Sequence, residues 1–528
     1  MRFLCVPRST TSPRPGAAWV MGVVAPLALA LLFAACASHD AHYGGSEDWS
    51  NGNGNGGTNV GFGGEQDFAY FRSQLENGVV PHPDVLQPSG FFAEHHTPLP
   101  APECGGALCL HPMLGVAPDL LGGSARHVLQ LGINTPIELD PEDRPDLDIT
   151  LSIDVSGSMS ADNRIGYVRS GLDLMLDELF DDDRLAIIVY SSDASVLMPM
   201  TRVGDAREDI RGSIQELRAG GMTALYDGLE LAYQEAHEHL DPEREARVVM
   251  LSDGEANVGP SSNEAIMGMS REYNDNGVGL TTIGLGDSFN VDLMRGLAEQ
   301  GDGNYYYVGS AADVEDVFTT EVHSFTVPVA RDVLVEVDEG RTYRFERAWG
   351  SPRWESRDDG GSLDLPSVFA AHRQSHDDTT DNEGRRGGGS ALLLELSPRA
   401  EPADDVEQAH VASIRFSYED PELGERVEQE IEVDLPHHPH EVPSEGTFQP
   451  GRAVIMKSFA MLHAYLALAG ATELFHDGEP EDALDLLAGA RDRLEPFEAR
   501  LNDGEGDEDI QRDLEIIEML EDVIAIHL

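Results

Sequence analysis

LDITLSIDVSGSMS, residues 147–160, runs from an apolar strand pattern directly into a loop rich in hydroxyl groups. Asp154, Ser156 and Ser158 occupy alternate positions, just where the strand is expected to end. Side chains at alternate positions can point to one side of the chain, and Gly157 between the serines permits a tight turn. The stretch therefore predicts a cluster of oxygen ligands at the end of a strand.

Strand and helix patterns alternate from residue 146 to residue 326. Apolar runs such as RLAIIVY (184–190) and RVVMLSD (247–253) are separated by segments whose apolar residues have helical spacing. This alternation is typical of a mostly parallel sheet with helices on both faces, which is a Rossmann-like, doubly wound α/β domain. Such sheets bind ligands at the carboxyl ends of their strands, where the loop after residue 154 is expected.

Two further oxygen donors follow at the same predicted edge. Thr223 lies in the turn GGMTALYDG (220–228), and Asp253 ends the apolar run in VMLSDGEANVG (249–259). Hard divalent cations such as Mg²⁺ prefer oxygen ligands of this kind. The competing explanation for the serines is helix capping, but capping does not account for a threonine and a second aspartate at the same edge.

The predicted site is rich in hydroxyls, which are neutral donors. We expect Ser156 and Ser158 to hold a cation directly, Asp154 to act directly or through water, and Thr223 and Asp253 to close the other side. A cation held mainly by hydroxyls keeps most of its charge. One coordination position then attracts a carboxylate from outside. The spacing predicts a metal site that is incomplete until a partner joins it.

The D-x-S-x-S sequence, the separate threonine and the later aspartate resemble the metal-ion-dependent adhesion site of von Willebrand factor type A domains. The five matching positions are Asp154, Ser156, Ser158, Thr223 and Asp253. The resemblance covers about 180 residues of the α/β pattern. It implies a bound Mg²⁺, or Mn²⁺ or Ca²⁺, and a protein partner whose Asp or Glu side chain completes the coordination.

A wider resemblance extends to both sides of this domain. The segments DFAYFRSQLENGVVPHPD (67–84), LMRGLAEQGDGNYYYVGSAADVEDVF (293–318) and VARDVLVEV (329–337) are similar to bacterial von Willebrand-type lipoproteins. In that family a conserved N-terminal segment, here 65–145, precedes the type A domain (146–326), and a β-rich domain follows. Its members are often described as similar to calcium-activated chloride channel components. Apart from the N-terminal run, we find no apolar run long enough to cross a bilayer, so we expect no channel here.

The remainder predicts a multidomain α/β plus β protein with a helical end. Residues 327–436 alternate apolar and polar positions, as in VLVEVD and VEQEIEVDL, which is typical of an antiparallel β-sandwich. A long exposed loop is expected around residue 377. Apolar residues at helical spacing over 447–528 predict a C-terminal hairpin or bundle of two or three helices.

The N-terminus carries export signals. Arginines at positions 2, 8 and 14 precede the uncharged run AAWVMGVVAPLALALLFAAC (17–36), which predicts a signal peptide over 1–36. FAAC (33–36) resembles a bacterial lipobox, with Cys36 as the lipidated residue; the alternative is an uncleaved membrane anchor. Residues 37–64, rich in Gly and Asn, are expected to form a tether. Both alternatives predict a cell-envelope protein, either periplasmic or at the cell surface.

Two cysteines remain in the predicted mature chain. Cys104 and Cys109 flank a glycine-rich turn, CGGALC. In an oxidising compartment such a pair predicts a small structural disulfide.

The charge of the chain restricts its partners. Asp and Glu number 96 against 35 Lys and Arg, which leaves a formal net charge of -61. Such a chain repels nucleic acid and anionic lipid surfaces, so we expect membrane association only through the lipid anchor. The acidic surface is explained by solubility, or alternatively by a basic partner.

No enzymatic apparatus is apparent in the sequence. There is no G-x-S-x-G elbow, and HEHL at 237–240 lacks the spacing of a zinc protease. We therefore expect a lipid-anchored, metal-dependent adhesion or scaffold protein that is not an enzyme. The competing hypothesis is a non-catalytic accessory subunit of a cell-envelope complex, and a hydrolase is a third, weaker one.

Overall fold

The computed structural model describes residues 58–65, 68–137, 144–254, 256–286, 289–311, 313–314, 317–319, 328–370, 390–399, 409–420 and 424–528. The predicted signal peptide with Cys36, the tether up to residue 57 and the loop around residue 377 lie outside the described residues. Residues 58–528 belong to one compact unit.

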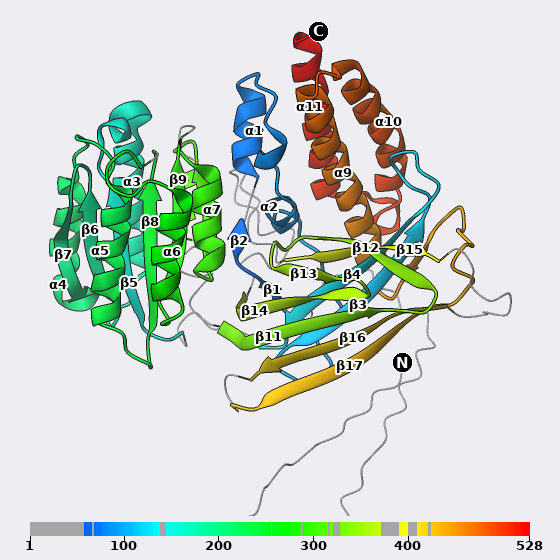
Figure 1. Ribbon diagram of the computed structural model, residues 1–528, viewed down its shortest axis with the longest axis horizontal. Coiled ribbons are helices and arrows are strands. Elements are labelled where there is room, and N and C mark those ends of the chain that lie inside the picture. The colour runs from blue at the N-terminus through cyan, green and yellow to red at the C-terminus, as the bar shows by residue number, and fades with distance from the viewer. Residues whose placement is uncertain are drawn as a thin grey trace, which may run out of the picture. The chain divides into compact units, whose positions relative to one another are not determined.

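A seven-stranded sheet forms the predicted α/β domain (Figure 1). Its strands lie in the order β2-β10-β9-β8-β5-β6-β7. All neighbours are parallel except β6 and β7, which form an antiparallel edge that the apolar pattern does not predict. The strands span Gly64–Glu65 (β2), Leu147–Asp154 (β5), Arg184–Tyr190 (β6), Ala194–Arg202 (β7), Glu245–Ser252 (β8), Gly279–Leu285 (β9) and Asn304–Val308 (β10).

Helices cover both faces of this sheet, as the alternating pattern predicts. One face packs on α3 (Arg164–Glu178) and α4 (Val203–Glu216). The other packs on α5 (Leu225–Glu238), α6 (Asn263–Asn274) and α7 (Val291–Gln300). The short helix η3 (Gly157–Asn163) joins β5 to α3. The doubly wound α/β fold is confirmed.

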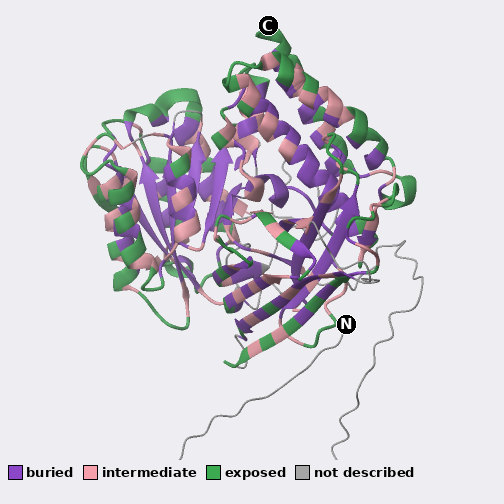
Figure 2. Cartoon of the chain, turned by 45° about the vertical axis from the view of Figure 1, so that its right-hand side comes forward, coloured by how far each residue is buried: buried purple, intermediate pink, exposed green. Residues whose placement is uncertain are grey.

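Strand β10 shows how one sequence serves both helix layers. Tyr306 packs in the core on the α3 side, while Tyr305 and Tyr307 pack in the core on the α5 side. All three rings are buried, so the strand has no surface face. Purple colouring along the central strands of this sheet shows similar burial (Figure 2), whereas the edge strand β7 has no buried residue.

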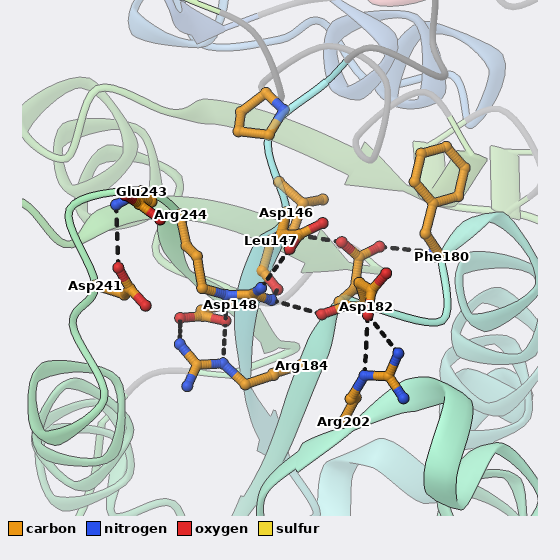
Figure 3. Close-up of polar contacts among 12 residues, drawn as sticks. Asp146, Leu147, Asp148, Phe180, Asp182, Arg184, Arg202, Asp241, Glu243 and Arg244 are labelled. Carbon is orange, nitrogen blue, oxygen red and sulfur yellow. Dashed lines mark hydrogen bonds and ion pairs between the residues drawn. The ribbon is translucent and has the colours of Figure 1, made fainter.

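Ion pairs fasten the amino ends of β5 and β6, at the edge opposite the predicted site (Figure 3). The buried carboxylate of Asp148 accepts from Arg184 Nε at 2.6 Å and from Arg244 Nε at 2.7 Å. Asp182 pairs with Arg202 nearby, but both of these side chains are exposed. The buried carboxylate needs its two arginines to offset the loss of hydration, so this cluster has a structural role.

The β-rich part is built from strands that precede the α/β domain in sequence and strands that follow it. Eleven strands form one connected set, in which β1 pairs with β4 through its first residues and with β14 through its last. The strands span Thr58–Gly61 (β1), Cys109–Ala117 (β3), Arg126–Thr135 (β4), Pro328–Glu339 (β11), Tyr343–Trp349 (β12), Trp354–Arg357 (β13), Gly360–Ala370 (β14), Leu392–Pro398 (β15), Ala409–Glu419 (β16), Arg426–Leu435 (β17) and Thr447–Gln449 (β18). The predicted segments 65–145 and 327–436 are therefore not separate bodies, because they share this sheet.

Alternation along β15 divides the core of this part into two layers. Leu392, Leu394 and Leu396 pack against the strands of the other half of the sandwich. Leu393, between them, packs with residues of the C-terminal helices. Each strand residue thus faces one of two apolar layers, which confirms the predicted sandwich and explains why LLLELS is apolar at consecutive positions.

Three helices end the chain: α9 (Arg452–His476), α10 (Pro480–Glu498) and α11 (Glu508–Ile526), with the short η5 (Asn502–Gly504) before the last. Lys457, the only lysine of the chain, is buried on α9 between Asp507 at 3.0 Å and Asp509 at 2.5 Å. Beside it His95 contacts Asp513 at 2.9 Å. Burial lowers the pKa of His95, but the charge and hydrogen bond of Asp513 outweigh it and raise that pKa above its ordinary value. The predicted bundle is confirmed.

Helix α9 corrects the expectation that no run beyond the N-terminal one is long and apolar enough to cross a bilayer. Among the described residues it is the one helix long and apolar enough to cross a membrane, with a mean hydropathy of 1.4 over its most apolar window. However, 78% of that window is buried inside the structure. A helix that is apolar on all sides and covered by protein is typical of a core helix.

The segments before the α/β domain differ from one prediction. Residues 58–61 and 64–65 are strands β1 and β2, so the tether predicted over 37–64 is wrong at its C-terminal end. The following helix α1 (Ala69–Glu76) agrees with the spacing of its apolar residues. The proline-rich stretch beyond it forms η1 (Pro83–Val85) and α2 (Pro88–Ala93), since proline is tolerated at the first helical position.

The predicted disulfide is present. Cys104 and Cys109 are bonded, with their Cα atoms 5.6 Å apart. The bond closes the glycine-rich turn that leads into β3.

Candidate metal centre

The five predicted ligands come together at the carboxyl ends of β5 and β8. Asp154 is the last residue of β5, and the two serines lie at the start of η3. Thr223 precedes α5, and Asp253 directly follows β8. Neighbours β5 and β8 lie at the point where the chain order of the sheet reverses, which is the usual ligand site of such sheets.

Short contacts connect the oxygen atoms of this site. Ser156 Oγ lies 2.9 Å from Ser158 Oγ, and Ser158 Oγ donates to Asp253 Oδ1 at 2.7 Å. A Cβ added to Gly254 would lie 3.8 Å from Ser158 Oγ and 3.8 Å from Thr223 Oγ1. Ser158 Oγ and Thr223 Oγ1 are therefore at most twice 3.8 Å apart, and Gly254 places no side chain between them.

Backbone hydrogen bonds hold the two ligand loops together. Gly220 N donates to Val155 O at 2.7 Å, and Gly157 N donates to Gly221 O at 3.1 Å. A Cβ on Gly157 would lie only 3.3 Å from Gly221 O. Glycine here lets the serine loop approach the threonine loop, which positions the hydroxyls.

Thr223 is also fixed from the β8 side. Its backbone N donates to Asn257 Oδ1 at 2.9 Å, and Asn257 Nδ2 lies 3.4 Å from Thr223 Oγ1. The backbone of Asn257 donates in turn to Thr223 O at 3.0 Å. The asparagine thereby connects the two loops that contribute Thr223 and Asp253.

Asp154 is fully buried, and both of its carboxylate oxygens have donors. Oδ1 accepts from Ser156 N at 2.8 Å, and Oδ2 accepts from Ser252 Oγ at 2.9 Å. Burial raises the pKa of Asp154 to about 6, against the lowering effect of these hydrogen bonds, and the charge of Asp253 raises it further. Asp154 thus orients the serine loop and supplies negative charge beneath the site.

Arg164, the first residue of α3, adds a contact that the sequence pattern does not predict. Its Nη1 donates to Asp253 Oδ2 at 2.8 Å, and both side chains are largely buried. Asp253 is therefore held at one oxygen by the arginine and at the other by Ser158.

These residues fit a small, hard divalent cation. Adjacent ligands of an octahedral ion with bonds of about 2.1 Å lie about 3.0 Å apart, close to the 2.9 Å that separates the two serine oxygens. Ser156, Ser158 and Thr223 would hold the ion directly, and Asp154 and Asp253 would supply the charge. In the described part of the chain no group of three or more His, Cys, Asp or Glu is placed to hold a metal, so this hydroxyl-rich set differs from sites built on such side chains.

The site is open on one side. Ser158 is exposed, whereas Asp154, Ser156, Thr223 and Asp253 are buried. An ion held here would be reached from solvent over Ser158.

Helix capping does not explain the serines. Ser156 stands at the cap position of η3, yet its side chain makes no capping hydrogen bond. Its hydroxyl contacts Ser158 instead.

Three residues that support the site were not predicted: Arg164, Ser252 and Asn257. Ser252 and Asn257 lie in the quoted run VMLSDGEANVG, so their proximity to Asp253 in sequence was an available signal. The pairing of Arg164 with Asp253 spans 89 residues and has no local signature.

Comparison with known proteins agrees with this geometry. Residues 148–320 match the family model of the von Willebrand factor type A domain. The chain therefore contains a domain of this family, and the candidate metal centre lies within it.

Relatives are similar over part of their length. YfbK of Escherichia coli (strain K12), an uncharacterized protein, is 29% identical over 291 residues, which are 53% of this chain and 48% of YfbK. A von Willebrand factor type A structure from Catenulispora acidiphila has a TM-score of 0.49 at 13% identity and covers 74% of this chain and 87% of that chain. Proximal thread matrix protein 1 from the mussel byssus, solved with a zinc-occupied MIDAS motif, has a TM-score of 0.30 at 19% identity, covering 34% of this chain and 48% of that chain.

Proposed function

We propose that this chain is a metal-dependent protein-binding protein of the cell envelope. Its site would hold Mg²⁺, or Mn²⁺ or Ca²⁺, through Ser156, Ser158 and Thr223, with Asp154 and Asp253 supplying charge. An Asp or Glu side chain of a partner protein would complete the coordination. The proposal covers adhesion and scaffolding, in which binding itself is the function.

The single observation that carries the proposal is the contact chain from Ser156 Oγ through Ser158 Oγ to Asp253 Oδ1, at 2.9 and 2.7 Å. The direct ligands are neutral hydroxyls, so the charge of a divalent ion would be offset only by the two carboxylates, of which Asp253 is already paired with Arg164. The open side over Ser158 gives a partner carboxylate access. Met222, next to Thr223, is 55% exposed and offers an apolar contact beside the ion.

A hydrolase is the weaker alternative for this site. A serine nucleophile needs a base within hydrogen-bond reach. The hydroxyls of Ser156 and Ser158 contact each other and Asp253, and Asp253 is engaged by Arg164. These contacts position oxygen atoms around a cation and do not activate a nucleophile.

Calorimetric titration of the full chain with Mg²⁺ tests the site directly. Ser158→Ala removes one ligand and should weaken Mg²⁺ binding at least tenfold, or about 1.4 kcal/mol. Ser160→Ala is the matched control, because Ser160 lies two residues away and its hydroxyl donates to Gly157 O. Equal Mg²⁺ affinity in the two variants, or no binding by the unmodified chain, would rule out the proposed site.

Partner binding is tested by affinity capture from envelope extracts with Mg²⁺, with chelator, and with Asp154→Ala. An adhesion or scaffold protein should lose an externally added ligand when the metal is removed. A non-catalytic accessory subunit, the second hypothesis, should lose the complex with which it co-purifies. Identical captured proteins under all three conditions would refute metal-mediated recognition of either kind.

We also propose that the chain is exported and lipid-anchored at Cys36, to face the periplasm or the cell surface. The basic segment, the uncharged run and FAAC support this, and the disulfide between Cys104 and Cys109 suits an oxidising compartment. Labelling with a radioactive fatty acid should mark the chain and fail to mark Cys36→Ser. A labelled Cys36→Ser protein would contradict this anchor.

A further inference from the structure

Arg164 places a permanent positive charge at the edge of the metal centre. Its side chain is only 10% exposed, and its Nη1 donates to Asp253 Oδ2 at 2.8 Å. Ser158 Oγ donates to the other oxygen of the same carboxylate at 2.7 Å. One oxygen of Asp253 therefore faces the hydroxyl ligands, and the other faces a guanidinium.

The fold reserves space for this guanidinium. At Gly286, which follows β9, an added Cβ would lie 2.5 Å from Arg164 Nε and 2.6 Å from Cζ. Gly286 also has φ +70°, a conformation that side chains other than glycine rarely adopt. The arginine can lie against the backbone here because the residue has no side chain.

The buried position of Arg164 would destabilise the fold if the role of this residue were purely structural. Arg164 Nε is buried and has no hydrogen-bond partner among the described residues. A buried donor without a partner destabilises the fold. The carboxylate of Asp162, on the other side of the guanidinium, lies 3.9 Å from Nη2 and is 87% exposed, so it contributes little.

Charges at the site can be counted from these contacts. The carboxylates of Asp154 and Asp253 supply two negative charges when ionised, and Arg164 supplies one positive charge. A divalent ion then leaves a net charge of plus one, whereas without the arginine the loaded site would be neutral. The guanidinium also occupies the oxygen of Asp253 that could otherwise turn toward the ion.

We propose that Arg164 is a positioning residue that acts through Asp253: it weakens the hold of the site on its cation and reserves the remaining charge for an acidic side chain of a partner. This inference rests on the function proposed above and assigns the residue that makes the site select a carboxylate. Removing the positive charge should tighten metal binding and reduce the preference for a carboxylate. If Arg164 were merely structural, its removal would instead weaken metal binding, because Asp253 would become disordered.

The first test is calorimetric titration of the full chain with Mg²⁺. Arg164→Gln keeps an N–H donor but removes the charge, and should bind Mg²⁺ about tenfold more tightly. Arg164→Lys keeps the charge and should bind like the unmodified chain. Arg211→Gln is the matched control, because it removes one charge from an ion-paired arginine on the outside of α4 and should change nothing.

The second test measures carboxylate preference with sodium acetate as the probe. Acetate, against acetamide at equal ionic strength, should tighten Mg²⁺ binding by the unmodified chain and do so less in Arg164→Gln. Gly286→Ala provides a second variant that leaves Arg164 in the sequence but displaces its guanidinium, and it should change both readouts in the same direction as Arg164→Gln. Melting in chelator establishes that each variant is folded.

Weaker or unchanged Mg²⁺ binding by both Arg164→Gln and Gly286→Ala would overturn this inference while leaving the metal site itself intact. Equal acetate effects in the unmodified chain and Arg164→Gln would overturn the part concerning carboxylate preference. Absence of Mg²⁺ binding by the unmodified chain would instead overturn the proposed function, and this inference with it.

Discussion

Gly228 connects the packing of the α/β domain to the metal centre. It lies in the first turns of α5, whose start is preceded by Thr223. A Cβ added to Gly228 would lie 2.2, 2.4 and 2.8 Å from Cδ1, Cγ and Cβ of Tyr190. Tyr190 is fully buried at the end of β6, so it cannot move away. Gly228→Ala should therefore push the start of α5, and Thr223 with it, away from the sheet.

Two opposing effects determine how much Gly228→Ala changes the free energy of unfolding. Overpacking a core costs about 1–3 kcal/mol, occasionally more, and three contacts below 3 Å place this substitution at the upper end. Replacing glycine by alanine inside a helix returns about 1 kcal/mol. The net loss is about 2 kcal/mol, which should lower the melting temperature of the α/β domain by about 4–8 °C. The same displacement should weaken Mg²⁺ binding, because it moves Thr223.

Gly212→Ala is the matched control, since Gly212 is in the interior of α4 and an added Cβ would meet nothing within 4 Å. That variant should be stabilised by about 1 kcal/mol. Calorimetry gives the melting temperatures, and hydrogen exchange measured on peptides from α5 locates the change. If Gly228→Ala is as stable as Gly212→Ala and binds Mg²⁺ equally well, the close approach of α5 to β6 does not position the site.

Other predictions concern buried charges. The pKa of Asp154 is raised from an ordinary 3.8 to about 6 in the folded chain, so protonation of this carboxyl stabilises the folded state; without metal, this stabilisation is complete below pH 3.8 and is lost as the pH rises through 6. Its size is on the order of 3 kcal/mol. Unfolding measured in chelator at different pH values should show this stabilisation, and Asp154→Asn should abolish it. Mg²⁺ affinity, in contrast, should fall as the pH drops below about 6, because the ligand must be ionised; a titration with no pH dependence there would contradict this. Asp148→Ala should destabilise the chain by about 3 kcal/mol, because Arg184 and Arg244 lose the buried carboxylate that they share. Asp182→Ala, at an exposed pair, should have a much smaller effect, and similar denaturation midpoints of the two variants would refute the distinction. Lys457→Met should cost about 3–5 kcal/mol, because it leaves two buried aspartates without their cation, and an unchanged midpoint would show that these carboxylates are protonated.

Much of the site was available in the sequence because its signals are local. The D-x-S-x-S loop, the turn with Thr223 and the run ending at Asp253 each lie where an apolar strand or a helix pattern changes to polar residues. Parallel strands bring such ends to one edge, so convergence of the five side chains could be predicted without coordinates. The α/β layers, the sandwich and the helical end followed from the periodicity of apolar residues.

Tertiary structure alone decided how distant segments share these elements. That β1, β3 and β4 pair with strands from beyond the α/β domain has no signature in a local pattern, since alternation shows which residues of a strand are buried but not which strand it joins. The same reason explains Arg164: a charge at the start of a helix looks solvated in sequence. Only the packing of α3 against the ends of β8 and β9 shows that it lies on Asp253 and Gly286. Ligand identity was thus encoded locally, whereas the charge balance of the site depends on contacts across 89 residues of chain.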